Sequence, residues 1–213
     1  MQTNITKKTP LEDSAGIIWL KLTDSTNDEA RRRLDALDNL SVVAAGKQTA
    51  GRGQGDHTWT SAPGRNLTFT FILKFPPCAP LPASEILLLT QTVTRGICQY
   101  LLSKGVEARI KWPNDIYVGG RKICGILIEN VLEGKRVAAS MIGIGLNLNQ
   151  LRFPASLPNP VSLRQLTGHS YDLQTELILL REELKKSASL LDTQEGRTEL
   201  SRDFDAFVFG RDA

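Results

Sequence analysis

The sequence predicts an α+β fold, in which a mixed β-sheet carries helices mainly on one face. Strand-like segments occur in groups along the chain, and segments with helical periodicity stand between these groups. The length of 213 residues and the hydrophobic fraction of 41% suit one catalytic-sized domain with a single core.

The first third of the chain holds three predicted strands and one helix. The strands are the apolar runs at residues 17–22, 41–46 and 66–75. Thr26 and Glu29 have the spacing of a capping box, so a helix is expected to begin there and to extend to about residue 40. Residues 1–16 are interpreted as a polar lead-in, and the glycine-rich residues 49–58 as a segment without regular structure.

The middle of the chain begins with a proline-rich connector at residues 76–82 and an apolar helix over residues 84–103. Further strands are expected at residues 106–111, 116–118, 122–131 and 135–149. Gly119 and Gly120 have the composition of a two-residue hairpin turn. The second and third of these strands are therefore predicted to pair as a hairpin.

The last third is predicted to be mostly helical. Helices are expected at residues 162–167 and 172–190. Residues 192–213 are interpreted as a polar tail or connector with a short aromatic-rich patch at residues 204–209.

Charge, cysteines and hydropathy exclude several classes of protein. The net charge is only +3, and the densest basic run, residues 31–33, lies inside a helical pattern, so no nucleic-acid site is expected. Cys78, Cys98 and Cys124 are odd in number and lack metal-ligand spacing, which favours a reducing compartment over disulfides or a zinc site. The polar N-terminus is no signal peptide, and no run approaches the roughly 20 apolar residues that span a bilayer. A cytoplasmic protein is expected.

The most informative motif is Arg-Ile-Lys-Trp-Pro-Asn-Asp at residues 109–115. Pro113 cannot donate to a sheet ladder, so the chain is expected to leave the sheet here with Lys111 at the exit. A lysine beside fixed polar groups at a strand end can bind a phosphate or a carboxylate. The alternative is an irregular edge-strand turn with a solvated lysine.

Residues 48–59 form a second motif, rich in glycine and containing Arg52. Glycines let the backbone approach a ligand closely, successive N–H groups can bind a phosphate, and an arginine offers a planar fork to its oxygens. The motif is neither a dinucleotide fingerprint, because a strand follows it, nor a P-loop, because it lacks the Gly-Lys-Ser/Thr ending. A mobile surface loop is the plain alternative.

Two shorter motifs complete the set. Ser25, Thr26 and Asn27 stand at a predicted helix start, where free N–H groups and hydroxyls could bind a polar ring or simply cap the helix. Gly143-Ile-Gly-Leu-Asn147 ends an apolar strand, where glycines indicate close approach of a ligand, or else a bulge or tight packing.

These four motifs, in this order, resemble the catalytic domain of biotin–protein ligases (biotin–acetyl-CoA-carboxylase ligases). The resemblance runs from about residue 19 to about residue 191. It implies the fold of the biotin and lipoate ligases, which is similar to that of class II aminoacyl-tRNA synthetases. A catalytic domain at residues 17–191 is therefore expected, with residues 192–213 as the tail or connector to a C-terminal barrel domain. The 16 residues ahead of Ile17 are too few for the DNA-binding domain of many relatives, so no DNA binding is expected.

The resemblance also implies an activity. Biotin and ATP would form biotinyl-5′-AMP, and a lysine of a biotin carrier domain of the acetyl-CoA carboxylase type would then take the biotin. Lys111 and Arg52 are the expected catalytic residues, because a cation between two anionic reactants reduces their repulsion. ATP and biotin are expected as substrates with Mg²⁺, and no residue is assigned as a metal ligand.

The resemblance assigns two sets of binding residues. The biotin-binding residues would be Ser25, Thr26, Asn27, Gln48, Gly51, Arg52, Gly53, Gln54, Lys111, Gly125, Gly143 and Gly145. The nucleotide-binding residues would be Arg52, Trp59, Lys111, Asn114 and Asn147. The chain departs from the family at Gln54 and His57, where relatives often have arginines, so retention of the adenylate is in doubt.

Other functions stay open at this point. A lipoate or octanoate protein transferase has a related catalytic domain, and a non-catalytic biotin-binding protein would lack ATP-dependent chemistry. A nucleic-acid-binding module would rest only on the weak positive charge. A homodimer is also left open, since some relatives dimerise through the central sheet.

Overall fold

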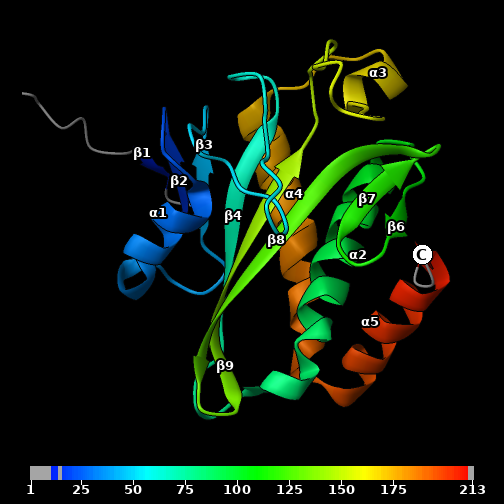
Figure 1. Ribbon diagram of the computed structural model, residues 1–213. Coiled ribbons are helices and arrows are strands. Elements are labelled where there is room, and N and C mark those ends of the chain that lie inside the picture. Colours follow the sequence, from blue (N-terminus) through cyan, green and yellow to red (C-terminus); the bar gives the residue numbers. More distant parts are fainter. Residues whose placement is uncertain (1–10, 14–15, 211–213) are drawn as a thin grey trace, which may run out of the picture.

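The computed structural model describes residues 11–13 and 16–210. In this part of the chain a ten-stranded mixed sheet runs in the order β1-β2-β3-β4-β9-β8-β7-β6-β10, with β5 paired to β9 off this path (Figure 1). Its strands are β1 (Leu11–Asp13), β2 (Ile17–Leu20), β3 (Val42–Ala45), β4 (Leu67–Lys74), β5 (Leu81–Pro82), β6 (Arg109–Lys111), β7 (Asp115–Val118), β8 (Arg121–Glu133), β9 (Arg136–Leu146) and β10 (Val208–Phe209). Two pairs are parallel, β2 with β3 and β6 with β10, and the others are antiparallel.

Helices cover mainly one face of this sheet, as predicted. They are α1 (Thr26–Arg32), α2 (Leu87–Ser103), α3 (Leu163–Thr167), α4 (Leu173–Ser189) and α5 (Gln194–Phe207), with short 3₁₀ turns at Leu34–Ala36, Ala83–Glu85 and Leu190–Asp192. α2 packs on both α4 and α5, whereas α1 packs on β3, β4 and β9. No described helix is both long and apolar enough to cross a membrane.

β4 shows how the sheet separates two cores. Phe69 and Phe71 point into the large core that the helices α2 and α4 cover, together with Leu89 and Leu180. Ile72, one residue on, points to the opposite face and packs in the small core beneath α1. Successive side chains of a strand alternate between faces, so one strand serves both cores.

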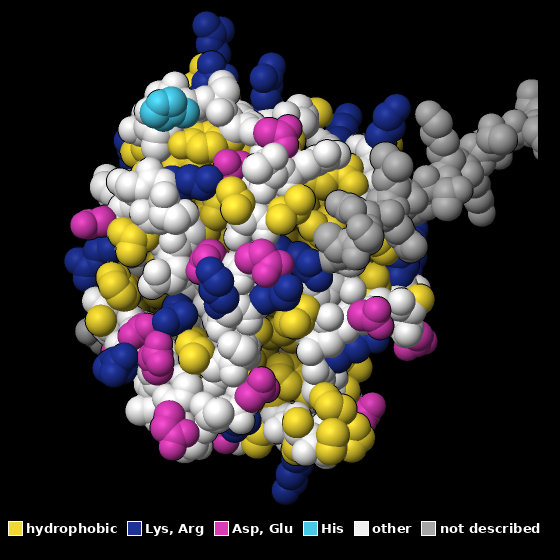
Figure 2. All heavy atoms as spheres, turned by 180° about the vertical axis from the view of Figure 1, so that it is seen from behind, with side chains coloured by type: hydrophobic (Ala, Val, Ile, Leu, Met, Phe, Trp, Pro, Cys, Tyr) yellow, Lys and Arg dark blue, Asp and Glu magenta, His cyan; other side chains and the backbone are white. Residues whose placement is uncertain are grey.

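The face seen from behind carries basic and acidic side chains side by side, with apolar side chains between them (Figure 2). A nucleic-acid-binding surface would need clustered positive charge. This face shows no such cluster on the described part of the chain.

The first helix is shorter than predicted, and its capping box is not formed. α1 ends at Arg32, and Ser25 is its N-cap without a side-chain cap. The Thr26 N–H donates instead to Gln48 Oε1 at 2.7 Å, so the glycine-rich segment supplies the acceptor. Glu29 accepts hydrogen bonds from Arg32 and Arg33.

Both ends of the chain hold more regular structure than predicted. Residues 11–13, read as lead-in, form β1, while residues 1–10 and 14–15 lie outside the described part. The tail contains α5, capped by Thr193, which buries Leu200 and Phe204 and ends in β10. Arg95 of α2 holds α5 through ion pairs with Glu199 and Asp203. Residues 211–213 lie outside the described part.

Candidate active site

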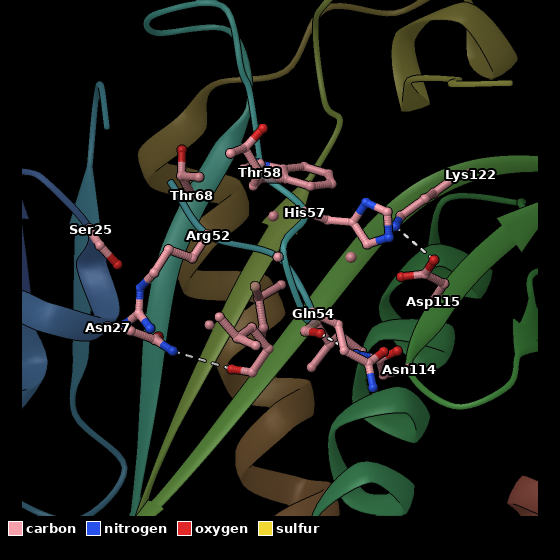
Figure 3. Close-up of a pocket in the computed structure, with 18 of the residues that line it drawn as sticks. Ser25, Asn27, Arg52, Gln54, His57, Thr58, Thr68, Asn114, Asp115 and Lys122 are labelled. Atoms are coloured by element: carbon pink, nitrogen blue, oxygen red, sulfur yellow. Dashed lines mark hydrogen bonds and ion pairs between the residues drawn. The ribbon is translucent and has the colours of Figure 1, made fainter. Parts of the chain in front are cut away.

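The four sequence motifs meet at one cavity of about 300 Å³. The N-terminus of α1, the glycine-rich loop of residues 48–59, the β6–β7 turn, the middle of β8 and the end of β9 surround it (Figure 3). The predicted site residues that line it are Ser25, Thr26, Asn27, Gln48, Arg52, Gly53, Gln54, Trp59, Lys111, Asn114, Gly125, Gly143 and Gly145. Segments up to 120 residues apart in sequence thus form one site.

Gly51 and Asn147 are the two predicted residues that do not line the cavity. The Trp59 N–H donates to the Gly51 carbonyl, and a side chain on Gly51 would meet the Trp59 carbonyl at 2.4 Å, so Gly51 allows the loop to close. Asn147 is only 4% exposed. Its backbone binds the carbonyl of Ile123 and the N–H of Leu163. Through these contacts the backbone of Asn147 links β8 to the start of α3 beside the site.

Asn27 is buried with a fixed amide orientation. Its Oδ1 accepts a hydrogen bond of 2.6 Å from Thr70 Oγ1, and its Nδ2 donates to Glu129 Oε2 at 2.8 Å and to the Leu127 carbonyl. A side chain on Gly143 would lie 2.7 Å from Asn27 Oδ1. Glycine at position 143 therefore leaves the space in which Asn27 sits.

Two carboxylates hold Arg52 in the glycine-rich loop. Its guanidinium donates to both oxygens of Glu129 at 2.9 Å and to Asp28 Oδ1 at 2.7 Å. The hydrogen bond to Glu129 raises the pKa of Arg52. Burial on its own would raise the pKa of Glu129, but hydrogen bonds from Arg52 and Asn27 outweigh it and hold that pKa below its usual value. In this arrangement Arg52 fixes the loop, and its charge is neutralised by protein groups.

Trp59 forms a flat wall of the cavity because two glycines leave room for it. Gly125 and Gly145 are partners in the β8–β9 ladder. A side chain would meet the Trp59 ring at 3.0 Å from Gly125 and at 2.2 Å from Gly145. The Lys122 ammonium lies 5.9 Å from the centre of the same ring.

Lys111 stands at the end of β6, at the exit from the sheet that the sequence predicted. Its ammonium lies 5.5 Å from the centre of the Tyr117 ring, and it makes no ion pair with the described residues. The next peptide bond, Trp112–Pro113, is cis. Because Lys111 lines the cavity and forms no ion pair with the described residues, its charge is available to a ligand.

Asn114 and Asp115 brace the turn after Lys111. Asn114 Nδ2 donates to the Ile126 carbonyl of β8, and Asp115 forms an ion pair of 2.7 Å with Lys122. These two contacts tie the β6–β7 turn to β8. Among the described residues there is no group of three or more His, Cys, Asp or Glu that could hold a metal ion.

The sequence missed several functional neighbours. The cavity is also lined by Thr58, Thr68, Ile126, Leu127 and Ile144. The last three belong to apolar strands, where nothing local separates a cavity wall from a core position. Glu129 was missed as well, although its carboxylate holds both Arg52 and Asn27.

The chain is similar to a known protein family and to several of its members. The model of the biotin/lipoate A/B protein ligase family matches residues 19–147. The biotin–[acetyl-CoA-carboxylase] ligase of Paracoccus denitrificans is 33% identical over 179 residues, which cover 82% of this chain and 73% of that protein. The bifunctional ligase/repressor of Bacillus subtilis is 39% identical over 137 residues, 62% of this chain and 41% of that protein. The chain thus spans less than half the length of the Bacillus relative.

A solved structure shares the fold. The biotin protein ligase of Aquifex aeolicus, in complex with biotin and ATP, superposes with a TM-score of 0.76 at 24% identity. The match covers 91% of this chain and 78% of that one.

Proposed function

Because the chain belongs to the biotin/lipoate A/B protein ligase family, we propose that it is an ATP-dependent biotin–protein ligase. The observation that carries this proposal is the position of Lys111, which forms no ion pair with another described residue, at the same cavity as Ser25 and Asn27. One cavity then brings a positive charge to a site that offers hydrogen-bond donors and acceptors.

The two ends of the cavity suit the two parts of the reaction. Figure 3 shows Ser25, Asn27 and Arg52 at one end, and Asp115 and Lys122 at the other. A cyclic urea needs both donors and acceptors, which the first end supplies. We assign the biotin ring to that end, and the phosphates to the end with the lysines.

The first step joins two anions. A carboxylate oxygen of biotin attacks the α-phosphorus of ATP, and the bond to pyrophosphate breaks. In this proposal Lys111 reduces the repulsion between the reactants and stabilises the charge of the transition state. Holding the two reactants in line supplies about 7–11 kcal/mol of the barrier in well-oriented systems.

The second step consumes the mixed anhydride. The ε-amine of a lysine on a carrier protein attacks the biotinyl carbonyl, AMP leaves with the bonding electron pair, and the nitrogen loses one proton to solvent as the amide forms. A carrier domain of the acetyl-CoA carboxylase type is the acceptor we propose, by similarity to the Paracoccus relative. Because ATP and such carriers meet in the cytoplasm, we place the reaction there.

Mg²⁺ would enter with ATP rather than reside in the protein. Magnesium keeps several waters and binds mainly to substrate phosphates and one or two carboxylates. The described part of the cavity offers Asp115 and no larger carboxylate cluster, which fits this mode. When bound, the ion would neutralise phosphate charge beside Lys111.

Biotin-dependent release of pyrophosphate from Mg-ATP tests the proposal, with the product analysed for biotinyl-5′-AMP by mass spectrometry. We expect release with biotin and much less with lipoate or octanoate at equal concentration. Preference for lipoate would instead identify a lipoate–protein ligase of the same family. Biotin binding without pyrophosphate release would identify a non-catalytic binding protein.

A further inference from the structure

The strand that carries Lys111 is completed by the last described strand of the chain. β6 is only three residues long, and β10 pairs with it in parallel, with Val208 opposite Ile110 and Phe209 opposite Lys111. The Trp112 N–H donates to the Phe209 carbonyl at 2.9 Å. The segment that the sequence placed in a polar tail therefore lies directly beside the lysine.

Side chains on one face of these strands form a continuous series. Arg109, Lys111, Tyr117 and Phe209 share this face, because paired residues and residues two apart lie on the same side of a sheet. Phe209 meets Tyr117 edge to face, with ring centres 5.9 Å apart and an angle of 85° between the rings. The Arg109 guanidinium lies 5.9 Å from the Phe209 ring centre. The Tyr117 ring thus contacts both the Phe209 ring and the Lys111 ammonium.

A lysine has a long, flexible stem, so its ammonium needs a neighbour to restrict where it lies. For Lys111 that neighbour is the Tyr117 ring, 5.5 Å from Nζ, through a cation–π contact. Tyr117 is held in turn by the edge-to-face contact with Phe209. Without the Phe209 ring, the Tyr117 ring would be free to rotate, and it would no longer hold the Lys111 ammonium in one position.

We propose that Phe209 is a positioning residue that sets the place of the Lys111 ammonium through Tyr117. This inference rests on the proposed function only where it concerns catalysis. It means that α5 and β10 belong to the catalytic machinery, since they bring Phe209 to the site. The effect should fall on the adenylation step and not on capture of biotin, because Phe209 does not line the cavity.

The test compares five forms of the full chain: wild type, F209A, F209L, F209Y and F207A. F209Y keeps the aromatic edge. Phe207 is the matched control, because it is 46% exposed against 37% for Phe209 and makes no contact with Tyr117 among the ring pairs of the described residues. Two readouts are taken: kcat and KM for biotin in pyrophosphate release, and the ¹³C NMR positions of reductively methylated lysines, with Lys111 assigned through K111R.

We expect F209A to lower kcat about three- to tenfold, with KM for biotin unchanged within about twofold. The methyl signal of Lys111 should move toward that of a free lysine, because it loses the ring current of Tyr117. F209Y and F207A should match wild type in both readouts. F209L keeps the apolar volume of the side chain but has no aromatic ring. It should behave like F209A, which would show that the effect comes from loss of the ring and not from unfolding.

An unchanged Lys111 signal in both F209A and F209L would overturn the inference, whatever the activity. The same holds if F207A shifts the signal as much as F209A. A wild-type chain that releases no pyrophosphate, but whose Lys111 signal shifts in F209A and F209L, would refute the proposed function and support the positioning by Phe209.

Discussion

Arg52 and Glu129 face each other through two parallel hydrogen bonds, each 2.9 Å long. This bidentate geometry is among the strongest that charged side chains form. The same carboxylate accepts from Asn27 at 2.8 Å. One side chain of β8 therefore fixes both the glycine-rich loop and the start of α1, the two segments that define the proposed biotin end of the cavity.

Replacing Glu129 by glutamine should release the loop. The amide of glutamine cannot accept two hydrogen bonds from Arg52 while accepting from Asn27, so one donor is left unpaired. We expect the free energy of unfolding to fall by about 1–2 kcal/mol and KM for biotin to rise. Limited proteolysis should cut residues 48–59 faster in E129Q than in wild type. D28N is the control: Asp28 makes a single, more exposed contact with Arg52, so its loss should cost less than about 0.5 kcal/mol.

Acid should remove the contribution of Glu129. Its folded-state pKa is held below the usual value, so its contribution to stability is present above the unfolded pKa of about 4.3 and is lost as the pH falls through the lower, folded value. Wild type should therefore exceed E129Q in stability at pH 7, and the difference should begin to shrink as the pH falls below about 4.3. Urea unfolding from pH 3 to 7 measures the difference. A gap that stays constant over this range would show that the ionised carboxylate contributes nothing.

Removing the Lys111 ammonium should stop adenylate formation. We expect K111A to lower kcat for pyrophosphate release by about 10²–10³-fold, the usual loss for one group that stabilises transition-state charge. Biotin binding, measured by calorimetry, should change far less. K21A removes an exposed lysine outside the cavity and should leave both values unchanged. A K111A rate close to that of wild type would disprove the assigned role.

Gly143 should be required for biotin capture rather than for folding. G143A would place a methyl group 2.7 Å from Asn27 Oδ1, and the displaced amide should raise KM for biotin about tenfold or more. G96A is the matched control, because its methyl would meet Leu184 at 2.9 Å where α2 packs on α4. It should lower the melting temperature and leave KM for biotin unchanged. The reverse pattern would assign Gly143 to packing alone.

Only one of the three cysteines should react quickly with a thiol reagent. Cys78 is exposed, whereas Cys124 is buried in the large core and Cys98 is partly covered. Burial raises the pKa of Cys98 to about 12 and that of Cys124 well above its usual value, so neither forms the reactive thiolate. The folded protein should thus take up one equivalent of Ellman's reagent rapidly, and three after denaturation. Rapid loss of activity through Cys124 would contradict its burial in the large core.

The sequence alone determined the sheet, most of its strands and the motifs that meet at the site. Apolar alternation over residues 66–75 predicted β4, and Gly119-Gly120 predicted the hairpin of β7 and β8. These features are local, since they depend on the spacing of neighbouring residues. For the same reason the sequence placed Lys111 at the end of a strand, where the structure has it.

The tertiary structure decided which distant residues meet. Glu129 lies 77 residues from Arg52, and Gln48 supplies the acceptor that the predicted capping box of Thr26 would have given. α5 has a mostly polar sequence, and its few apolar residues are buried against α2. β10 is only two residues long, and it is a strand because it pairs with β6. Such pairings leave no local periodicity in the chain. They are stabilised only after folding has brought the segments together, so they could not be predicted from the spacing of residues.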